Sequence, residues 1–320
     1  MPTLSFKLID CRTRSFFQFS VLKDLLLKND FKHFLQYTQE YEKFVKDWIS
    51  EKIVEYFTDN YNKLCDIVVC HQTKIIKKIK HTVEGETSAR GGKSGNICQF
   101  IQEICTKLEK ELVIPKTALD KFMALNKADP MDFSRCLISI MEEMEKKPRA
   151  EFEQQKDVKS VLTDLPFKPE NELFSRVFGC GKQCPFCKTP CEAVGKDHPE
   201  HFASVHRPDG IGQYRWRDSK KLTTDVCSSC VASEKQFSCS ATSGNYHPYK
   251  DYRKFFPDWR IQPDAITEAS DYWKYVFATF NDQFAKEFNA KAADIPESWK
   301  LIDNDKALKS LEEAYRMIIE

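Results

Sequence analysis

Residues 180–208, CGKQCPFCKTPCEAVGKDHPEHFASVHRP, hold four cysteines and three histidines and decide how the surrounding chain folds. Cys184 and Cys187 form a C-x2-C pair, His201 and His206 form an H-x4-H pair, and thirteen residues separate the two pairs. Thiolate and imidazole are the donors that Zn²⁺ takes in closed tetrahedral sites, and a C-x2-C turn lets two thiolates reach one ion. The spacing therefore predicts a structural zinc site made by these four side chains.

Other cysteines and a third histidine leave the ligand set open. Cys191 and Cys180 are alternatives that could each replace a histidine, and His198 is the weakest candidate, which we expect to be exposed. Downstream, Cys227 and Cys230 form another C-x2-C pair that could complete a cross-braced module with two zinc ions. Their irregular spacing instead favours two buried thiols at a strand end, above all for Cys230. Reduced cysteines and surface histidines without metal are the remaining alternative.

Motifs of catalytic or DNA-reading zinc sites are missing from the sequence. Neither H-E-x-x-H nor H-x-E with P-C-x-x-C occurs, so we expect no catalytic residue in this chain. A DNA-reading finger needs a continuous hairpin, whereas Pro185, Pro190 and Pro199 interrupt the segment. One such finger would also contact only about three base pairs. We therefore expect no DNA partner.

The composition is that of an ordinary soluble globular protein. A net charge of +1 gives no global attraction to nucleic acid, acidic lipid or an acidic substrate. The 13 cysteines are an odd number, no secretory signal begins the chain, and no apolar run reaches the roughly 18 residues of a membrane helix. These features predict reduced cysteines and a cytoplasmic location, with the nucleus as a second compartment.

Apolar periodicity predicts a mainly α-helical fold. From Phe31 to Phe57, aromatic and aliphatic residues recur at steps of three and four, which is the spacing of one buried helix face. A similar aromatic stripe begins near Glu268. We expect a poorly patterned N-terminus at 1–30, a helical bundle or stalk at 31–170, and a small zinc-stapled α+β module with aromatic C-terminal helices at 171–320.

Two further segments resemble functional motifs but favour simpler interpretations. Gly92-Lys93-Ser94 resembles the end of a phosphate-binding loop, but Thr87 stands where the motif needs a glycine, and a basic helix replaces the required buried strand. We expect a flexible loop at 84–95 and no nucleotide or other cofactor-binding residue. The basic segment around Lys77 could meet an anionic membrane or RNA surface, but lysines at a helix C-terminus favour a solvated face. Membrane contact through Lys77 is not expected.

Five motifs in a fixed order resemble a known family. They are CPFCKTPCE at 184–192, DHPEHFASVHRP at 197–208, HPYKDYRKFFPDW at 247–259, ASDYWKYVFATFN at 269–281 and AADIPESWK at 292–300. Together they resemble the C-terminal region of the interferon-inducible very large GTPases. The resemblance extends from about residue 180 to residue 315, and more loosely over the helical region from Phe31.

The resemblance implies a C-terminal piece without the family's G domain, which lies well upstream, so GTP is not expected to bind this chain. It agrees with the set Cys184, Cys187, His201 and His206, whereas Cys230 departs from the family pattern. It also implies a role in interferon-responsive immunity. We expect a non-enzymatic structural or interaction region with unidentified protein partners or self-association. The alternatives are a GTPase whose G domain lies outside this chain and, more weakly, a zinc-dependent nucleic-acid or ubiquitin-pathway module.

Overall fold

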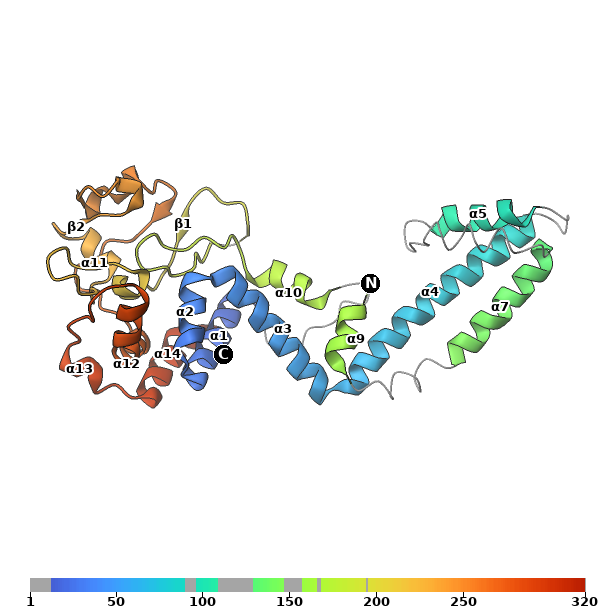
Figure 1. Ribbon diagram of the computed structural model, residues 1–320, viewed down its shortest axis with the longest axis horizontal. Coiled ribbons are helices and arrows are strands. Elements are labelled where there is room, and N and C mark those ends of the chain that lie inside the picture. Colours follow the sequence, from blue (N-terminus) through green and yellow to red (C-terminus); the bar gives the residue numbers. More distant parts are fainter. Residues whose placement is uncertain are drawn as a thin grey trace. The chain divides into compact units, whose positions relative to one another are not determined.

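The chain is described by a computed structural model over residues 13–89, 96–108, 129–146, 157–165, 168–193 and 195–319. It divides into two compact units, Met1–Ile53 with Lys168–Glu320 and Val54–Phe167. Among the described residues, helices dominate both units, and short strands occur only in the first (Figure 1). The predicted fold, mainly α-helical with a small Cys/His-rich α+β module before the C-terminal helices, is confirmed.

The second unit, 54–167, contains helices arranged around a small apolar cluster. They are α4 (Tyr61–Ala89), α5 (Ile97–Leu108), α7 (Pro130–Lys146) and α9 (Val158–Asp164). Both α5 and α7 pack on α4. Val83 of α4 is buried with Phe100 and Ile104 of α5, which lie on one face because their spacing matches one helical turn.

Helix α4 includes the basic segment and extends beyond it. Ile76 is buried and Lys77 is exposed, as in an amphipathic helix. The helix continues through 84–89, which we expected to be a loop, and there the Thr87 hydroxyl donates to the carbonyl of residue 83 at 2.7 Å. Residues 92–94, which resemble a phosphate loop, lie outside the described residues. No helix in the described ranges is long and apolar enough to cross a membrane.

The helical part of the first unit brings the N-terminal helices together with the C-terminal helices. Helix α1 (Arg14–Lys28) packs on α14 (Asn304–Ile319), and α2 (Phe31–Gln39) packs on α12 (Asp271–Glu287), which also contacts α13 (Glu297–Lys300). The Thr13 hydroxyl caps α1 by accepting from the Phe16 N–H at 3.1 Å. The buried Tyr272 hydroxyl of α12 donates to the Leu22 carbonyl of α1 at 2.8 Å, which fixes these two helices together.

The N-terminal helices differ from the three segments expected from the sequence. Part of 1–30 forms the regular helix α1, and the helix expected from Phe31 to Phe57 is divided at Glu40 into α2 and α3 (Tyr41–Asp59). The Phe31 ring lies 5.0 Å from that of Phe284 on α12, between centroids. Because their apolar faces pack on the C-terminal helices, α1 and α2 belong to the unit that contains the α+β module.

The α+β module follows α10 (Pro169–Val177) and has little regular structure. Strand β1 (His201–Phe202) is parallel to β4 (Trp259–Arg260), and β2 (Gln236–Phe237) is antiparallel to β3 (His247–Pro248). Short helices η1 (Asp209–Gly212), α11 (Cys227–Val231), η2 (Ser240–Thr242) and η3 (Tyr249–Lys254) connect them. The strands expected near 214–216 and 222–226 do not form, and the two segments are joined by a single β-bridge between Arg215 and Leu222.

Aromatic packing supplies the core of this module. The buried Phe186 ring contacts a group of other aromatic rings, namely Tyr214, Phe237, Tyr249, Tyr252 and Phe256. The backbone packs closely beside it, since a Cβ at Gly212 would collide with the Phe186 carbonyl. Two-residue strands make few backbone hydrogen bonds, so the module depends on side-chain contacts to hold its loops.

Candidate metal centre

Two groups of Cys and His side chains lie in the α+β module. The first group is Cys184, Cys187, His206 and Cys227, all of them buried. The second group is Cys180, Cys191, His198 and His201, of which Cys191 and His201 are buried. Within each group the donor atoms all lie within 4.8 Å of one another. The two groups interleave along the chain. Cys184 and Cys187 of the first group lie in sequence between Cys180 and Cys191 of the second.

A tight turn places two donors of the first group. The Lys188 N–H donates to the Cys184 carbonyl at 3.0 Å, and the Cys184 N–H donates to the Thr189 carbonyl at 2.8 Å. Lys188 closes the turn in the left-handed region, with φ of 61°. This turn points both thiols inward, and Cys227 reaches them as the first residue of α11. The first group thus joins segments far apart in the sequence.

Distances in the first group match a tetrahedral zinc shell. Two sulphurs bonded to zinc at about 2.3 Å lie about 3.8 Å apart, and a sulphur and a nitrogen lie about 3.5 Å apart. The Cys227 sulphur is 3.9 Å from the sulphurs of both Cys184 and Cys187. His206 Nδ1 lies 3.3 Å from the Cys187 sulphur and 3.0 Å from the Cys227 sulphur. The four donors therefore surround a space of the size that one ion needs.

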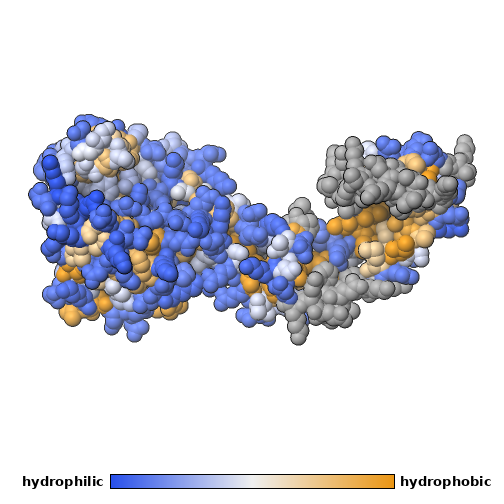
Figure 2. All heavy atoms as spheres, viewed as in Figure 1, coloured by the Kyte–Doolittle hydropathy of each residue, from blue (hydrophilic) through white to orange (hydrophobic). Residues whose placement is uncertain are grey.

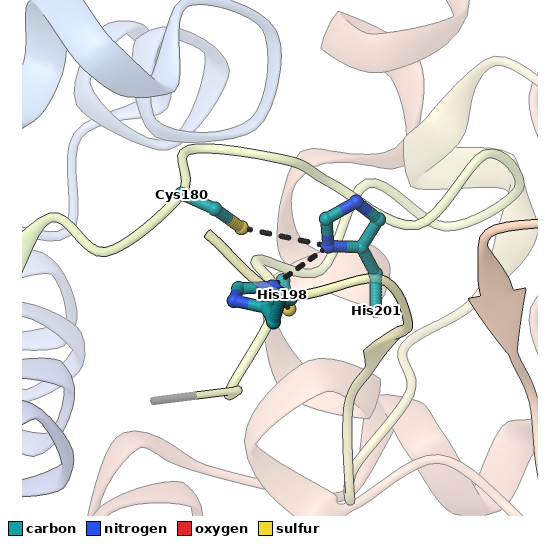
Figure 3. A group of neighbouring side chains, drawn as sticks. Cys180, His198 and His201 are labelled. Carbon is teal, nitrogen blue, oxygen red and sulfur yellow. Dashed lines mark hydrogen bonds between the residues drawn. The ribbon is translucent and has the colours of Figure 1, made fainter. Parts of the chain in front are cut away.

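The second group converges in the same way around His201. Its Nδ1 lies 3.6 Å from the Cys180 sulphur and 2.9 Å from His198 Nε2, and Figure 3 shows both side chains directed toward it. His198 Nε2 also lies 3.4 Å from the Cys191 sulphur. Cys191 is held by its N–H, which donates to the Lys182 carbonyl at 2.8 Å. Two sulphurs and two nitrogens thus face one point.

A carboxylate orients His201 from the side away from the group. His201 Nε2 lies 3.4 Å from Asp258 Oδ2, while Nδ1 faces the other donors. The His201 N–H also donates to the Asp258 carbonyl at 2.6 Å, as β1 pairs with β4. Histidines that bind metals commonly direct their second nitrogen to a carboxylate, which fixes the ring and the tautomer. The sequence offered no signal for this pairing, because 56 residues lie between the two.

In the first group, neighbouring thiols and imidazole shift the pKa values of Cys187 and His206. Burial opposes ionisation of Cys187, but hydrogen bonds from Cys184 and Cys227 and the neighbouring His206 hold the pKa of its thiol well below the ordinary value. Burial also disfavours protonated His206, but the Cys187 charge raises the pKa of its imidazole well above the ordinary value. His206 Nε2 is buried and has no hydrogen-bond partner. Binding a metal would require His206 to lose its proton.

A fully buried arginine lies directly behind the first group. Arg207 Nε donates to the Cys187 carbonyl at 2.5 Å. Its guanidinium carbon lies 4.7 Å from the ring centre of Trp273 on α12 and 5.5 Å from that of Tyr37 on α2. Both Nη atoms are buried without hydrogen-bond partners. Arg207 thus connects the turn that carries Cys187 to two helices.

The comparisons with known proteins cover this region. Residues 180–311 match the family described as interferon-induced very large GTPase 1, C-terminal domain. The predicted resemblance is confirmed. The mouse interferon-induced very large GTPase 1 is 25% identical over 314 residues, and the human protein is 24% identical over 301 residues. These alignments cover 93% and 91% of this chain but only 12% of each relative, so the chain spans a small part of their length. No solved structure matches the chain significantly.

The matched domain contains all eight donor residues. The structure distributes the four ligands predicted from the sequence over both groups. Cys184, Cys187 and His206 come together, and Cys227 completes their group. His201 lies in the second group, with both alternatives, Cys180 and Cys191. His198, expected to be exposed, is partly buried and directed at His201. Cys230 is buried in the apolar core and belongs to neither group. The density of Cys and His residues was the signal for a second group, whereas spacing alone placed both His201 and His206 with Cys184 and Cys187.

Both groups have the chemistry of closed sites. Each offers four protein donors, and sulphur and imidazole nitrogen are the atoms involved. All described cysteines are free thiols, so none of these sulphurs is used in a disulfide. Four protein ligands leave no coordination position for a substrate, unlike a catalytic zinc site with three. The residues present therefore fit metal ions that hold the fold.

Proposed function

We propose that this chain is a non-enzymatic interaction region, similar to the C-terminal domain of the very large GTPases, whose fold is stabilised by two structural zinc ions. The observation that supports it most directly is the pair of interleaved groups, each with four thiol or imidazole donors. Among divalent metals, Zn²⁺ best suits mixed sulphur and nitrogen donors in a tetrahedron. Zinc would supply the links that the short strands of the module do not.

The location of the groups explains why two ions would be needed. The first group ties the turn at Cys184 to α11, and the second ties the loop at Cys180 to β1. The strand pairs of this module contain two residues each, and an isolated pair of such length is not stable in water. Binding free energy of structural zinc contributes directly to folding in small modules. Each ion would therefore fix loops that no sheet secures.

The GTPase in the relatives' names belongs to those much longer proteins. This chain spans 12% of their length, and its closed donor groups provide no position for a reacting group. We propose that the chain binds protein partners or its own copies and does not hydrolyse GTP. The proposed location is the cytoplasm, with the nucleus as a second compartment, and the proposed context is interferon-responsive immunity. Both proposals rest on the resemblance.

Metal analysis of the purified chain tests the proposal. We expect about two zinc ions per chain by elemental mass spectrometry, with loss of folded structure on chelation. Cys227→Ser and Cys180→Ser should each remove about one ion, because they belong to different groups. Cys230→Ser is the matched control, since it alters a buried thiol outside both groups. A chain that folds fully without metal would refute the structural role, and release of phosphate from GTP by the purified chain would refute the assignment as non-enzymatic.

A further inference from the structure

A groove of about 760 Å³ lies on the first unit, and none of the eight candidate metal ligands lines it. One wall carries Gln39, at the end of α2, and Lys188, from the Cys184–Thr189 turn. The other walls come from residues 213–225 and from residues 235–240, which include β2. The visible surface of this unit is mainly hydrophilic (Figure 2). The groove is therefore a polar depression, unlike an apolar ligand pocket.

Positive charge is concentrated in this groove. Its basic residues are Lys188, Arg215, Arg217, Lys220 and Lys235, and Asp225 is its one acidic residue. The whole chain has a net charge of only +1, so this density is local. Lys235 forms an ion pair with Asp225 at 2.7 Å, whereas Arg215 donates to the Asn289 carbonyl at 2.9 Å and keeps its charge uncompensated. A ligand with several negative charges suits this surface.

Exposed aromatic rings lie among these cations. Trp216 is 49% exposed and Tyr246 is 40% exposed, although large aromatic side chains are usually more buried. Lys235 Nζ lies 5.6 Å from the Trp216 ring centre, and the Arg217 guanidinium lies 5.2 Å from that of Tyr246. Each cation holds a ring in place and lines the groove beside it. Flat rings next to positive charges can stack bases while the cations contact phosphates.

The backbone of the groove is held in an unusual conformation. Lys188, Gln213 and Lys220 have φ of 61°, 77° and 60°, in the left-handed region that glycine normally occupies. A side chain in this region costs about 1 kcal/mol relative to glycine. All three residues line the groove, and each carries a long polar side chain. The chain thus keeps hydrogen-bonding or charged groups at positions where glycine would be more stable, as functional surfaces often do.

We propose that this groove binds single-stranded nucleic acid. The cations match phosphates, and the exposed rings of Trp216 and Tyr246 match unpaired bases. A duplex keeps its bases stacked on each other and leaves these rings without partners. An acidic peptide would satisfy the charges but not the rings. The proposal adds a nucleic-acid ligand to the protein partners proposed above, and it rests on the fold of the same region.

Fluorescence anisotropy with the full chain tests the proposal. The probes are labelled oligouridylate and oligothymidylate of about ten nucleotides, a duplex of equal length, and polyglutamate. We expect both single strands to bind more tightly than the duplex or polyglutamate, and the two sugars distinguish RNA from DNA as the preferred form. Affinity should fall with salt, since each phosphate contact contributes about 0.7 to the logarithmic slope. Tighter binding of the duplex or polyglutamate, or no binding, would overturn the proposal.

Matched variants separate the groove from the rest of the surface. Trp216→Ala should weaken binding about tenfold, because stacking on one ring is lost. Leu301→Ala removes an exposed apolar side chain outside the groove and should change nothing. Lys220→Gly removes a charge while relieving the left-handed backbone, so affinity should fall although the melting temperature rises. Lys309→Ala, on α14, is the charge control because it also removes one positive charge, and an equal loss there would show unspecific attraction and overturn the proposal.

Zinc content measured on the same preparation distinguishes two failures. A sample with about two zinc ions that binds no single strand contradicts only the groove. A folded sample without zinc that still binds contradicts the structural metal and leaves the groove intact.

Discussion

Arg207 is the residue whose replacement should most clearly reveal what holds the α+β module to the helices. It is fully buried, bonded to the Cys187 carbonyl, and placed between the Trp273 and Tyr37 rings. A zinc ion bound by three thiolates and one neutral imidazole, the donors that the first group offers, would have a net charge of −1. The second group, with two thiolates and two imidazoles, would be neutral. With zinc bound as proposed, Arg207 would offset the negative charge of the first group, and the second group would need no such cation.

The magnitude follows from the interactions that Arg207 makes. A hydrogen bond from a charged group contributes about 1.5–3 kcal/mol, and a desolvated cation over an aromatic ring contributes about 2 kcal/mol. Removing one partner of a buried charge pair costs about 3–5 kcal/mol. Arg207→Met keeps much of the apolar contact and should lower the free energy of unfolding by about 3 kcal/mol. Arg207→Lys keeps the charge but loses planar stacking, so its effect should be smaller.

Zinc release distinguishes this electrostatic role from packing alone. With a colorimetric chelator, Arg207→Met should release one of two zinc ions at least tenfold faster than the unaltered chain and the other at an unchanged rate. Cys227→Ser identifies the faster ion, because that variant retains only the second group. Equal acceleration of both ions would indicate general loosening of the fold. Unchanged release with lower stability would mean that Arg207 acts only by packing, and either result would refute the reasoning.

Two further predictions concern the second group and the N-terminal helices. Asp258→Asn should weaken zinc in the second group about 10- to 100-fold, measured by competition with a chelator, because His201 loses the carboxylate that orients it. Asp24→Asn should lower the free energy of unfolding by about 1 kcal/mol at neutral pH, measured by urea denaturation, since Trp48 Nε1 donates to Asp24 at 3.0 Å and Lys52 pairs with it at 3.2 Å.

The Asp24 prediction has a defined pH dependence. Burial would raise the pKa of Asp24, but the charges of Lys52 and Lys28 and the Trp48 hydrogen bond lower it below the ordinary 3.8. A carboxyl whose pKa is lower in the folded chain than in the unfolded chain stabilises the fold at any pH above its unfolded pKa. This stabilisation is lost as the pH falls through its folded pKa. The difference between the two chains should therefore disappear in acid. A constant difference down to pH 2 would contradict the assignment to Asp24 ionisation.

Two matched comparisons sharpen these tests. Asp251→Asn changes a carboxylate on η3 that pairs with Lys254, and it should leave zinc affinity unaltered, unlike Asp258→Asn. Glu51→Gln removes the exposed partner of Lys28 and should cost less than Asp24→Asn, because exposed ion pairs contribute little. An equal loss of zinc affinity in both variants would show that contact with His201 does not govern the effect of Asp258→Asn, and a larger cost for Glu51→Gln would show that burial does not govern the ion pairs.

The sequence revealed the ligands better than their grouping. Cys184 and Cys187 could be paired because two residues between cysteines suffice for a turn. Spacing could not show that His201 faces Cys180, since its direction depends on the pairing of β1 with β4. Nor could it show that Cys227, forty residues after Cys187, closes the first group, because the connecting loops contain almost no regular structure. Side chains that meet across long loops leave no periodic pattern in the sequence from which their contact could be predicted.

The groove and the first group share the Cys184–Thr189 turn. We expect loss of zinc to disturb the groove, and we do not expect changes in the groove to disturb zinc. Gln183 Nε2 donates to the Thr38 carbonyl of α2 at 3.0 Å and to the Lys188 carbonyl at 2.8 Å, so one side chain joins the helix, the turn and the groove wall. Lys188 has its left-handed conformation within the turn that carries Cys184 and Cys187, and bound zinc would fix this turn as proposed above. Removing zinc should therefore abolish nucleic-acid binding. Trp216→Ala should leave zinc content unchanged, because that exposed ring supports neither donor group.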